Sequence, residues 1–234
     1  MARKAAEPIP HLSDAERSER VPTYMARLEE RYGDPRPALD YRSAYELLIA
    51  VILSAQSTDV GVNKVTPVLF ARYPDCASLA SADPAEVEEI VHATGFFRQK
   101  TKHIIGACQM IVAEHGGEVP DTMEELTALP GVARKTANIV LGNAFDKVEG
   151  IAVDTHVFRL SHRLGLSEAT DPDKVEIDLC REIPRDHWHR VNYDLISHGR
   201  AICTAKRPAC GACFLNDACP SAFEVSGWRE EVPS

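Results

Sequence analysis

Helical periodicity is the feature of this sequence that most constrains the fold of the chain. Apolar residues recur at spacings of three and four through most of the 234 residues, whereas Val, Ile and Thr never alternate with polar residues over a long stretch. Asp-Pro and Gly-Gly pairs mark points where helices begin and end. The sequence therefore predicts an all-α fold, with helices over residues 23–32, 42–54, 59–73, 83–93, 98–115, 155–164, 171–182 and 186–198.

Residues 121–145 predict two further helices joined by a tight hairpin. Asp121 followed three residues later by Glu124 is the pattern of a capping box, and Pro130-Gly131 ends the first helix with a sharp turn. The second helix is expected to begin near Val132. The first N–H groups of a helix have no partner within it, and together with the helix dipole they can bind a phosphate group.

Two charged residues in or near this hairpin are candidate catalytic residues. Lys135 is expected in the first turn of the second helix, where the positive end of the dipole disfavours an ammonium and so favours the neutral, nucleophilic amine. Asp154 lies in the turn before the helix expected over 155–164. Taken alone, the two residues favour a simpler interpretation, in which Lys135 contacts a phosphate and Asp154 caps a helix.

Four cysteines with the spacing C-x6-C-x2-C-x5-C lie near the end of the chain: Cys203, Cys210, Cys213 and Cys219. Thiolates this close together bind zinc, bind an iron–sulfur cluster or form disulfides. Structural zinc sites usually have two short chelating pairs, and this chain has one. The spacing therefore favours zinc and a [4Fe–4S] cluster equally, and disulfides less. The remaining cysteines are expected to be free thiols: Cys76, Cys108 and Cys180.

Three motifs occur together in this chain. They are Leu129-Pro-Gly-Val-x-x-Lys135-Thr-Ala, Val153-Asp154-Thr-His156-Val-x-Arg159 and the four-cysteine spacing. Together they resemble the endonuclease III family, the helix-hairpin-helix DNA glycosylase/AP lyases of base-excision repair. The similarity continues upstream through Leu53-Ser-Ala-Gln-Ser-Thr-Asp59 and Thr94-Gly-Phe-Phe97, and spans about residues 22–219.

The resemblance implies a chemistry for the candidate residues. Lys135 would be the nucleophile, Asp154 the catalytic carboxylate, and the four cysteines the ligands of a [4Fe–4S] cluster. Branches of the family that excise adenine or mismatched thymine lack the lysine, so Lys135 indicates the bifunctional branch, which also cleaves the strand. The implied partner is double-stranded DNA that carries an oxidised or ring-saturated pyrimidine or an abasic site.

The resemblance also implies residues that contact DNA. In this interpretation the hairpin binds a phosphate, two loop residues fill the space left by an extruded nucleotide, and other residues contact the backbone. Without the resemblance, Gln56 and His156 would be interpreted as surface polar residues and Phe96 as a core aromatic. The family usually has Gly where this chain has Ala133, and Leu-Tyr where it has Phe96-Phe97. The predicted contacts are Gln56, Phe96, Gly131, Val132, Ala133, His156, Lys206 and Arg207.

The expected architecture has two helical halves, with the active-site cleft between them. Residues 1–20 are expected to be a mobile tail, in which Ser13-x-x-Glu16 could cap a short helix. A six-helix bundle is expected over 41–150. The other half is discontinuous by resemblance: the N-terminal helix within 21–40 joins the C-terminal helices within 151–234, which carry the cluster loop at 203–219.

Charge and composition limit the kinds of binding partner that this chain can have. A formal net charge of −9 argues against a generic polyanion binder, but Lys206 and Arg207 form a local basic strip. No apolar run is long enough to span a membrane, and residues 1–6 lack the apolar core of a secretory signal. We therefore expect an intracellular, cytoplasmic, DNA-associated monomer with no membrane partner.

Two other classes of protein compete with the repair enzyme at this point. A helix-hairpin-helix module could hold DNA without chemistry, with Lys135 as a phosphate contact. A small electron carrier could be built around the cluster. Both would lack an imine that borohydride can trap on abasic DNA.

Overall fold

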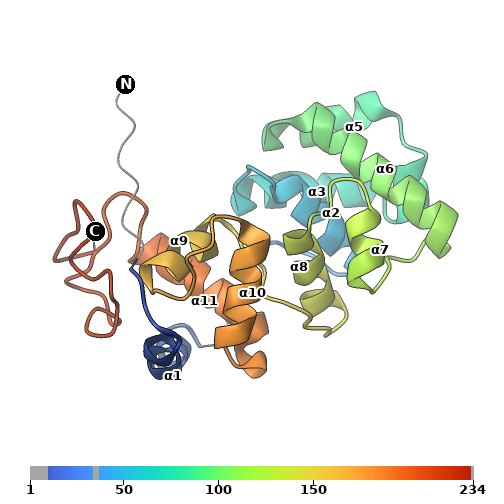
Figure 1. Cartoon of the computed structure of the whole chain (residues 1–234). Helices are drawn as coiled ribbons and strands as arrows, with labels where there is room; N and C mark the ends of the chain where they lie inside the picture. The colour runs from blue at the N-terminus through green and yellow to red at the C-terminus, as the bar shows by residue number, and fades with distance from the viewer. Residues whose placement is uncertain (1–9, 34–36, 233–234) are drawn as a thin grey trace. The chain divides into compact units, whose positions relative to one another are not determined.

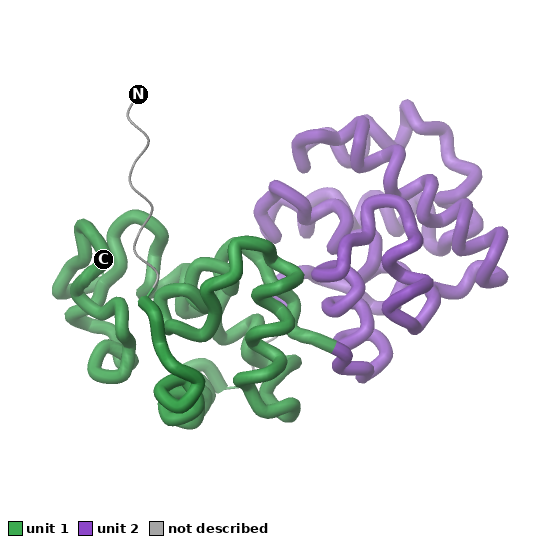
Figure 2. Tube along the Cα trace, viewed as in Figure 1, with its two compact units in different colours: residues 1–36, 150–234 green, residues 37–149 purple. Residues whose placement is uncertain are grey.

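In the computed structural model, which describes residues 10–33 and 37–232, all regular structure is helical. The predicted all-α fold is therefore confirmed. The chain divides into two compact units, one built from Met1–Arg36 with Gly150–Ser234 and the other from Pro37–Glu149 (Figure 2). No helix in the described part of the chain is long and apolar enough to cross a membrane.

The unit Pro37–Glu149 is organised around one buried helix, α2. Every residue from Leu47 to Leu53 of α2 is buried, so this helix is surrounded by others and has no polar face. It packs against α3, α6 and α8. Figure 1 labels the elements of this unit from α2 to α8, except α4 and η1. The elements are α2 (Ala44–Ser54), α3 (Asp59–Arg72), α4 (Cys76–Ala80), α5 (Pro84–Val91), η1 (His92–Thr94), α6 (Phe97–His115), α7 (Met123–Ala128) and α8 (Arg134–Ala144).

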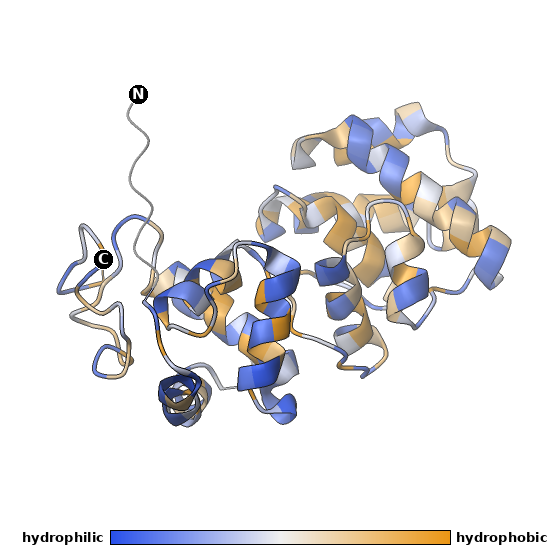
Figure 3. Ribbon diagram, viewed as in Figure 1, coloured by the Kyte–Doolittle hydropathy of each residue, from blue (hydrophilic) through white to orange (hydrophobic). Residues whose placement is uncertain are grey.

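The other unit joins the N-terminal helix to the C-terminal helices. Its core contains Tyr24 and Leu28 of α1 together with Leu160, Leu179 and Leu195 from later helices. Figure 3 shows hydrophilic residues of α10 in blue and hydrophobic ones in orange, which is the pattern of a helix that covers a core on one side only. The elements are α1 (Asp14–Tyr32), α9 (Thr155–Arg163), α10 (Pro172–Glu182), η2 (Arg185–His187) and α11 (Trp188–Ala201).

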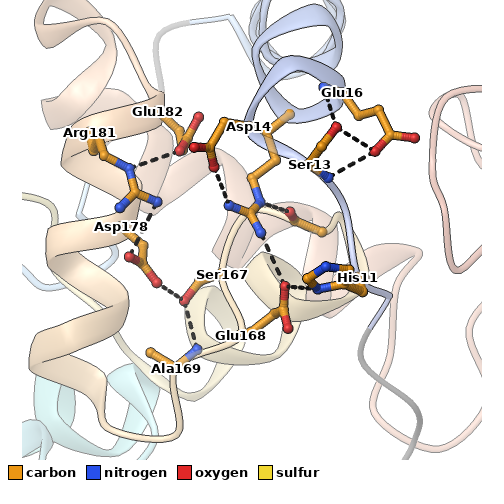
Figure 4. Close-up of polar contacts among 12 residues, drawn as sticks. His11, Ser13, Asp14, Glu16, Ser167, Glu168, Ala169, Asp178, Arg181 and Glu182 are labelled. Carbon is orange, nitrogen blue, oxygen red and sulfur yellow. Dashed lines mark hydrogen bonds and ion pairs between the residues drawn. The ribbon is translucent and has the colours of Figure 1, made fainter.

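Polar contacts attach the start of α1 to the loop between α9 and α10 (Figure 4). Ser13 and Glu16 form a capping box at the start of α1. Glu168 accepts hydrogen bonds from His11 Nδ1 at 2.9 Å and from Arg17 Nη2 at 3.1 Å. The expectation of a mobile tail over residues 1–20 is therefore wrong from Asp14 onward, and residues 1–9 lie outside the described part of the chain.

Most helix boundaries follow the sequence, and two differ for identifiable reasons. Helix α1 begins at Asp14 rather than at Thr23, because Ser13 and Glu16 cap it there and Pro22 is accommodated inside the helix. Pro22 and Ser18, whose carbonyl loses its partner, are both exposed, so solvent can hydrogen-bond that carbonyl. Helix α7 is capped by Thr122, one residue after the predicted Asp121.

Candidate active site and cysteine cavity

The hairpin between α7 and α8 is a tight turn that requires glycine. Val132 N–H donates to the Leu129 carbonyl at 3.1 Å and closes the turn. Gly131 has φ +79°, and a Cβ built there would lie 2.8 Å from the His103 side chain. The backbone at this point therefore lies closer to α6 than any other residue would allow.

Helix α8 begins immediately after this turn without a side-chain cap. Ala133, the N-cap residue, is extended at φ −90° and ψ 167°, and the first turn contains no acidic residue. Helices α1 and α10, in contrast, have a Ser or Asp cap and acidic residues in their first turns. The start of α8 therefore has the character of an anion-binding helix end.

Lys135 occupies the first turn of α8, as predicted. Its side chain is half-buried, and among the described residues none forms a hydrogen bond or ion pair with it. The following residues, Thr136 and Ala137, are buried and hold the turn against the core. The amine is therefore carried by a rigid element and is not used in the internal structure of the protein.

Asp154 is the N-cap of α9. Its Oδ1 accepts hydrogen bonds from the backbone N–H groups of His156 and Val157, both at 2.8 Å. The helix cap expected from the sequence is thus present, and it leaves a catalytic role for Asp154 open to test. Because both bonds use Oδ1, the cap orients the carboxyl group and leaves Oδ2 for a further partner.

His156 and Arg159 pack from α9 against the end of α11. Arg159 Nη2 lies 3.2 Å from His156 Nδ1 and donates to the carbonyl oxygens of Gly199 at 3.1 Å and Cys203 at 3.0 Å. A Cβ on Gly199 would lie 2.7 Å from His156 Nδ1, so glycine permits this contact. Burial lowers the pKa of His156, which favours its neutral form. The pair links α9 to the first cysteine of the cluster motif.

Gln56 and Phe96 have the same unusual backbone conformation. Their φ angles are +53° and +47°, in the left-handed region that non-glycine residues rarely adopt. Phe96 is 66% exposed, so its interpretation as a core aromatic is wrong. Phe97, in contrast, stacks on His92 with ring centroids 4.4 Å apart. Of the two phenylalanines, Phe96 is the one presented to solvent.

The four cysteines of the C-terminal motif line a single cavity. Its other walls are largely apolar and include Leu160, Ile202 and Leu215. Cys203 and Cys213 accept hydrogen bonds at sulfur, from Arg163 Nη1 at 3.3 Å and from the Leu215 N–H at 3.4 Å. All four are free thiols: Cys203, Cys210, Cys213 and Cys219.

The surroundings of these thiols suit a bound metal cluster. Burial raises the pKa of Cys213 to about 11 and that of Cys219 to about 12, so both thiols would be protonated without a cation beside them. A metal provides that positive charge and converts the thiols to thiolate ligands. Hydrogen bonds from Arg163 and a backbone N–H to sulfur also stabilise thiolates. The donor set therefore fits an iron–sulfur cluster.

The segment between the first two cysteines projects two basic residues. Lys206 and Arg207 are exposed. Arg163, itself only 5% exposed, donates to the carbonyl oxygens of Thr204 at 2.8 Å and Ala205 at 3.0 Å and so holds the backbone of this segment in place. Sequence analysis did not identify Arg163, because nothing in the motif distinguishes it from an ordinary charged residue at a helix end.

Comparison with known proteins identifies the class to which this fold and site belong. A family model described as HhH-GPD superfamily base excision DNA repair protein matches residues 49–185. A second, described as the iron-sulfur binding domain of endonuclease III, matches residues 203–219. The fold and the site thus define a helix-hairpin-helix base-excision repair protein with an iron–sulfur domain.

Individual relatives narrow this class to one family. Endonuclease III of Synechocystis sp. is 53% identical over 208 residues, which cover 89% of this chain and 95% of that protein. Endonuclease III of Escherichia coli K12 is 40% identical, covering 83% of this chain and 92% of that protein. The solved structure of a trapped endonuclease III–DNA covalent intermediate is 38% identical with a TM-score of 0.84, covering 88% of this chain and 97% of that one. The chain belongs to the endonuclease III family.

Proposed function

We propose that this protein is a bifunctional DNA glycosylase/AP lyase that excises oxidised or ring-saturated pyrimidines from double-stranded DNA. The observation that carries the proposal is Lys135, an amine in the first turn of an uncapped helix that follows a glycine hairpin. A related endonuclease III has been trapped as a covalent intermediate with DNA, which requires a nucleophile on the protein. Because its substrate is DNA, we propose an intracellular location.

Base excision begins with extrusion of the damaged nucleotide, since its glycosidic carbon is shielded inside the duplex. We propose that Gln56 and Phe96 fill the vacated space. Both are exposed residues on tight loops of the unit Pro37–Glu149. Gly131, Val132 and Ala133 would lie against the DNA backbone at the start of α8, with the N–H groups of Gly131 and Ala133 as donors, because the Val132 N–H closes the turn. Such contacts orient the strand without reading its sequence.

The first chemical step replaces the base with the lysine. The neutral Lys135 amine attacks the sugar C1′, and a C–N bond forms as the bond from C1′ to the base breaks. The base leaves with the bonding electron pair and takes up a proton from solvent. Asp154 stabilises the positive charge that develops on the sugar or accepts the proton released by the amine. Its Oδ1 is held by the α9 cap, which gives the carboxyl group a defined orientation.

The second step cleaves the strand. The sugar ring opens to a protonated imine between Lys135 and C1′, and this imine withdraws electrons from the adjacent C2′. A proton leaves C2′, and the bond from C3′ to its oxygen breaks, which releases the 3′ phosphate by β-elimination. Water as the nucleophile would stop at the abasic site, so this step depends on the lysine.

The [4Fe–4S] cluster would be held by Cys203, Cys210, Cys213 and Cys219 and would supply structural cross-linking of their segment. We propose that this organises Lys206 and Arg207 for contact with the DNA backbone. His156 would add a further backbone contact. Phosphate contacts from a few exposed side chains are compatible with the negative net charge of the chain.

The proposal is tested by borohydride trapping on a duplex with one abasic site. Wild-type protein is expected to form a covalent complex, because borohydride reduces the imine to a stable amine. Lys135→Gln should form none, while Lys102→Gln, an exposed lysine on α6, serves as the matched control and should trap like wild type. A DNA-binding module or an electron carrier would give no covalent complex even in the wild type. That result would contradict the proposal.

A further inference from the structure

The two loops that carry Gln56 and Phe96 are joined by one buried lysine, Lys100. Gln56 follows the end of α2, and Phe96 precedes α6, so α3, α4, α5 and the short helix η1 separate the two loops along the chain. Lys100 lies in the first turn of α6 and is only 4% exposed. Its side chain reaches both loops.

Three polar groups meet at this point. Lys100 Nζ donates to Ser57 Oγ at 2.5 Å and to the Thr94 carbonyl at 2.8 Å. The Ser57 hydroxyl donates to the same Thr94 carbonyl. Each loop thus supplies one oxygen, and Lys100 connects the two. We call these residues, Ser57, Thr94 and Lys100, the loop tie.

The loop tie lies immediately beside the two exposed residues. Ser57 follows Gln56 directly, and Thr94 is separated from Phe96 only by Gly95. Gln56, Gly95 and Phe96 all have positive φ angles, at +53°, +69° and +47°. Non-glycine residues in the left-handed region persist only where the surroundings hold them there. The loop tie supplies that constraint on both loops at once.

A buried lysine at position 100 has a free-energy cost, which indicates a specific role. An ammonium group buried without an ion-pair partner costs free energy, and no described carboxylate pairs with Lys100. Burial lowers the pKa of Lys100, in agreement with that cost. An apolar residue would fill the same space more favourably for stability. A role in holding two loop oxygens together explains why a polar group is present instead.

We propose that Lys100 is a positioning residue for nucleotide extrusion, which sets the separation and direction of Gln56 and Phe96 through Ser57 and Thr94. This inference rests on the proposed function, in which those two residues fill the space left by the extruded nucleotide. Without the loop tie the loops would sample other conformations, and Gln56 and Phe96 would no longer enter the duplex as a pair. The reacting groups would be unchanged.

The test compares excision, which requires extrusion of a stacked base, with cleavage of a preformed abasic site, which has no base to unstack. Lys100→Met keeps the length and burial of the side chain and removes the donors. Ser57→Ala removes the hydroxyl group that accepts from Lys100 and donates to the Thr94 carbonyl. Both are expected to slow single-turnover excision of thymine glycol from a duplex by about tenfold or more. Cleavage of the abasic duplex should remain within about twofold of wild type.

Two controls separate positioning from general damage to the fold. Lys100→Arg retains the donors and should recover most of the excision rate, and Lys102→Met, on the exposed side of the same helix, should have no effect. Fluorescence of 2-aminopurine beside the lesion should show reduced extrusion in Lys100→Met. Equal loss of both activities, or unchanged excision, would overturn the inference. Failure of the wild type to form a trapped imine would instead contradict the proposed function.

Discussion

Two neighbouring residues of the hairpin respond differently to an added side chain. Gly131 is in the left-handed region and lies against His103, so even a methyl group there would collide with a ring at 2.8 Å. Ala133 is extended, at φ −90°, and exposed, so its methyl group causes no strain within the protein. In the proposed complex, the methyl group of Ala133 would face the phosphate bound at the start of α8. The cost of Ala133 is therefore expected in DNA binding and not in folding.

Ala133→Gly is expected to bind an abasic-site duplex about two- to threefold more tightly, because contacts at a helix N-terminus contribute ~0.3–1 kcal/mol. Fluorescence anisotropy of a labelled duplex, at the same salt concentration for both proteins, measures this change in affinity. Gly131→Ala is the matched variant and should bind more weakly, since the turn must open to admit the methyl group. An Ala133→Gly protein that binds no more tightly than wild type would show that the methyl group does not approach the phosphate.

At the scale of helices, the sequence predicts best where a local signal determines the boundary. Asp171-Pro172 correctly marks the start of α10, because Asp171 caps the helix and proline needs no N–H there. Pro22, in contrast, lies inside α1, so a proline does not by itself mark the start of a helix. Helix α4, only five residues long, was not predicted, because so short a segment has no measurable periodicity.

The residues of the candidate site, like the helix boundaries, could be predicted where a local motif marks them. Lys135 and the cysteines belong to recognisable motifs, so the sequence identifies them. Lys100 and Arg163 do not, because their importance arises from burial and from contacts with segments distant in the chain. A buried lysine on an otherwise polar stretch of helix has no sequence signature. Such residues are visible only when the fold brings their partners together.

The cap of α9 allows the two roles of Asp154 to be separated. Asn is as good an N-cap as Asp, whereas Ala removes the cap at a cost of about 1 kcal/mol. The free energy of unfolding of Asp154→Asn should therefore lie within about 0.5 kcal/mol of the wild-type value, whereas that of Asp154→Ala should be lower. Both should lose excision by about a hundredfold or more, because both lack the charge. Thermal unfolding and single-turnover excision measure the two effects. If Asp154→Asn excises at the wild-type rate, Asp154 is a cap only.

At the scale of the whole molecule, the described residues form two hydrophobic cores with no residue in common. One core is formed entirely by residues of Pro37–Glu149, around α2. The other is formed by α1 and the C-terminal helices. After α11 the chain continues without a helix through the cysteine motif (Figure 1). This segment has individual turn hydrogen bonds, such as Cys213 N–H to the Cys210 carbonyl at 3.2 Å, in place of the continuous hydrogen bonding of a helix. Its order is therefore expected to depend more strongly on side-chain contacts and on the cluster.

Removal of the cluster is therefore expected to loosen one region selectively. After oxidative destruction of the iron–sulfur centre, amide hydrogen exchange should accelerate over residues 203–232, while Leu47–Leu53 of α2 remain protected. Substitution of Cys213 by Ser should have the same effect. Since Lys206 and Arg207 would lose their fixed positions, the affinity for abasic DNA should fall and its dependence on salt should weaken. Loss of protection in α2 at the same time would instead indicate that the two cores unfold together and that the cluster stabilises the entire chain.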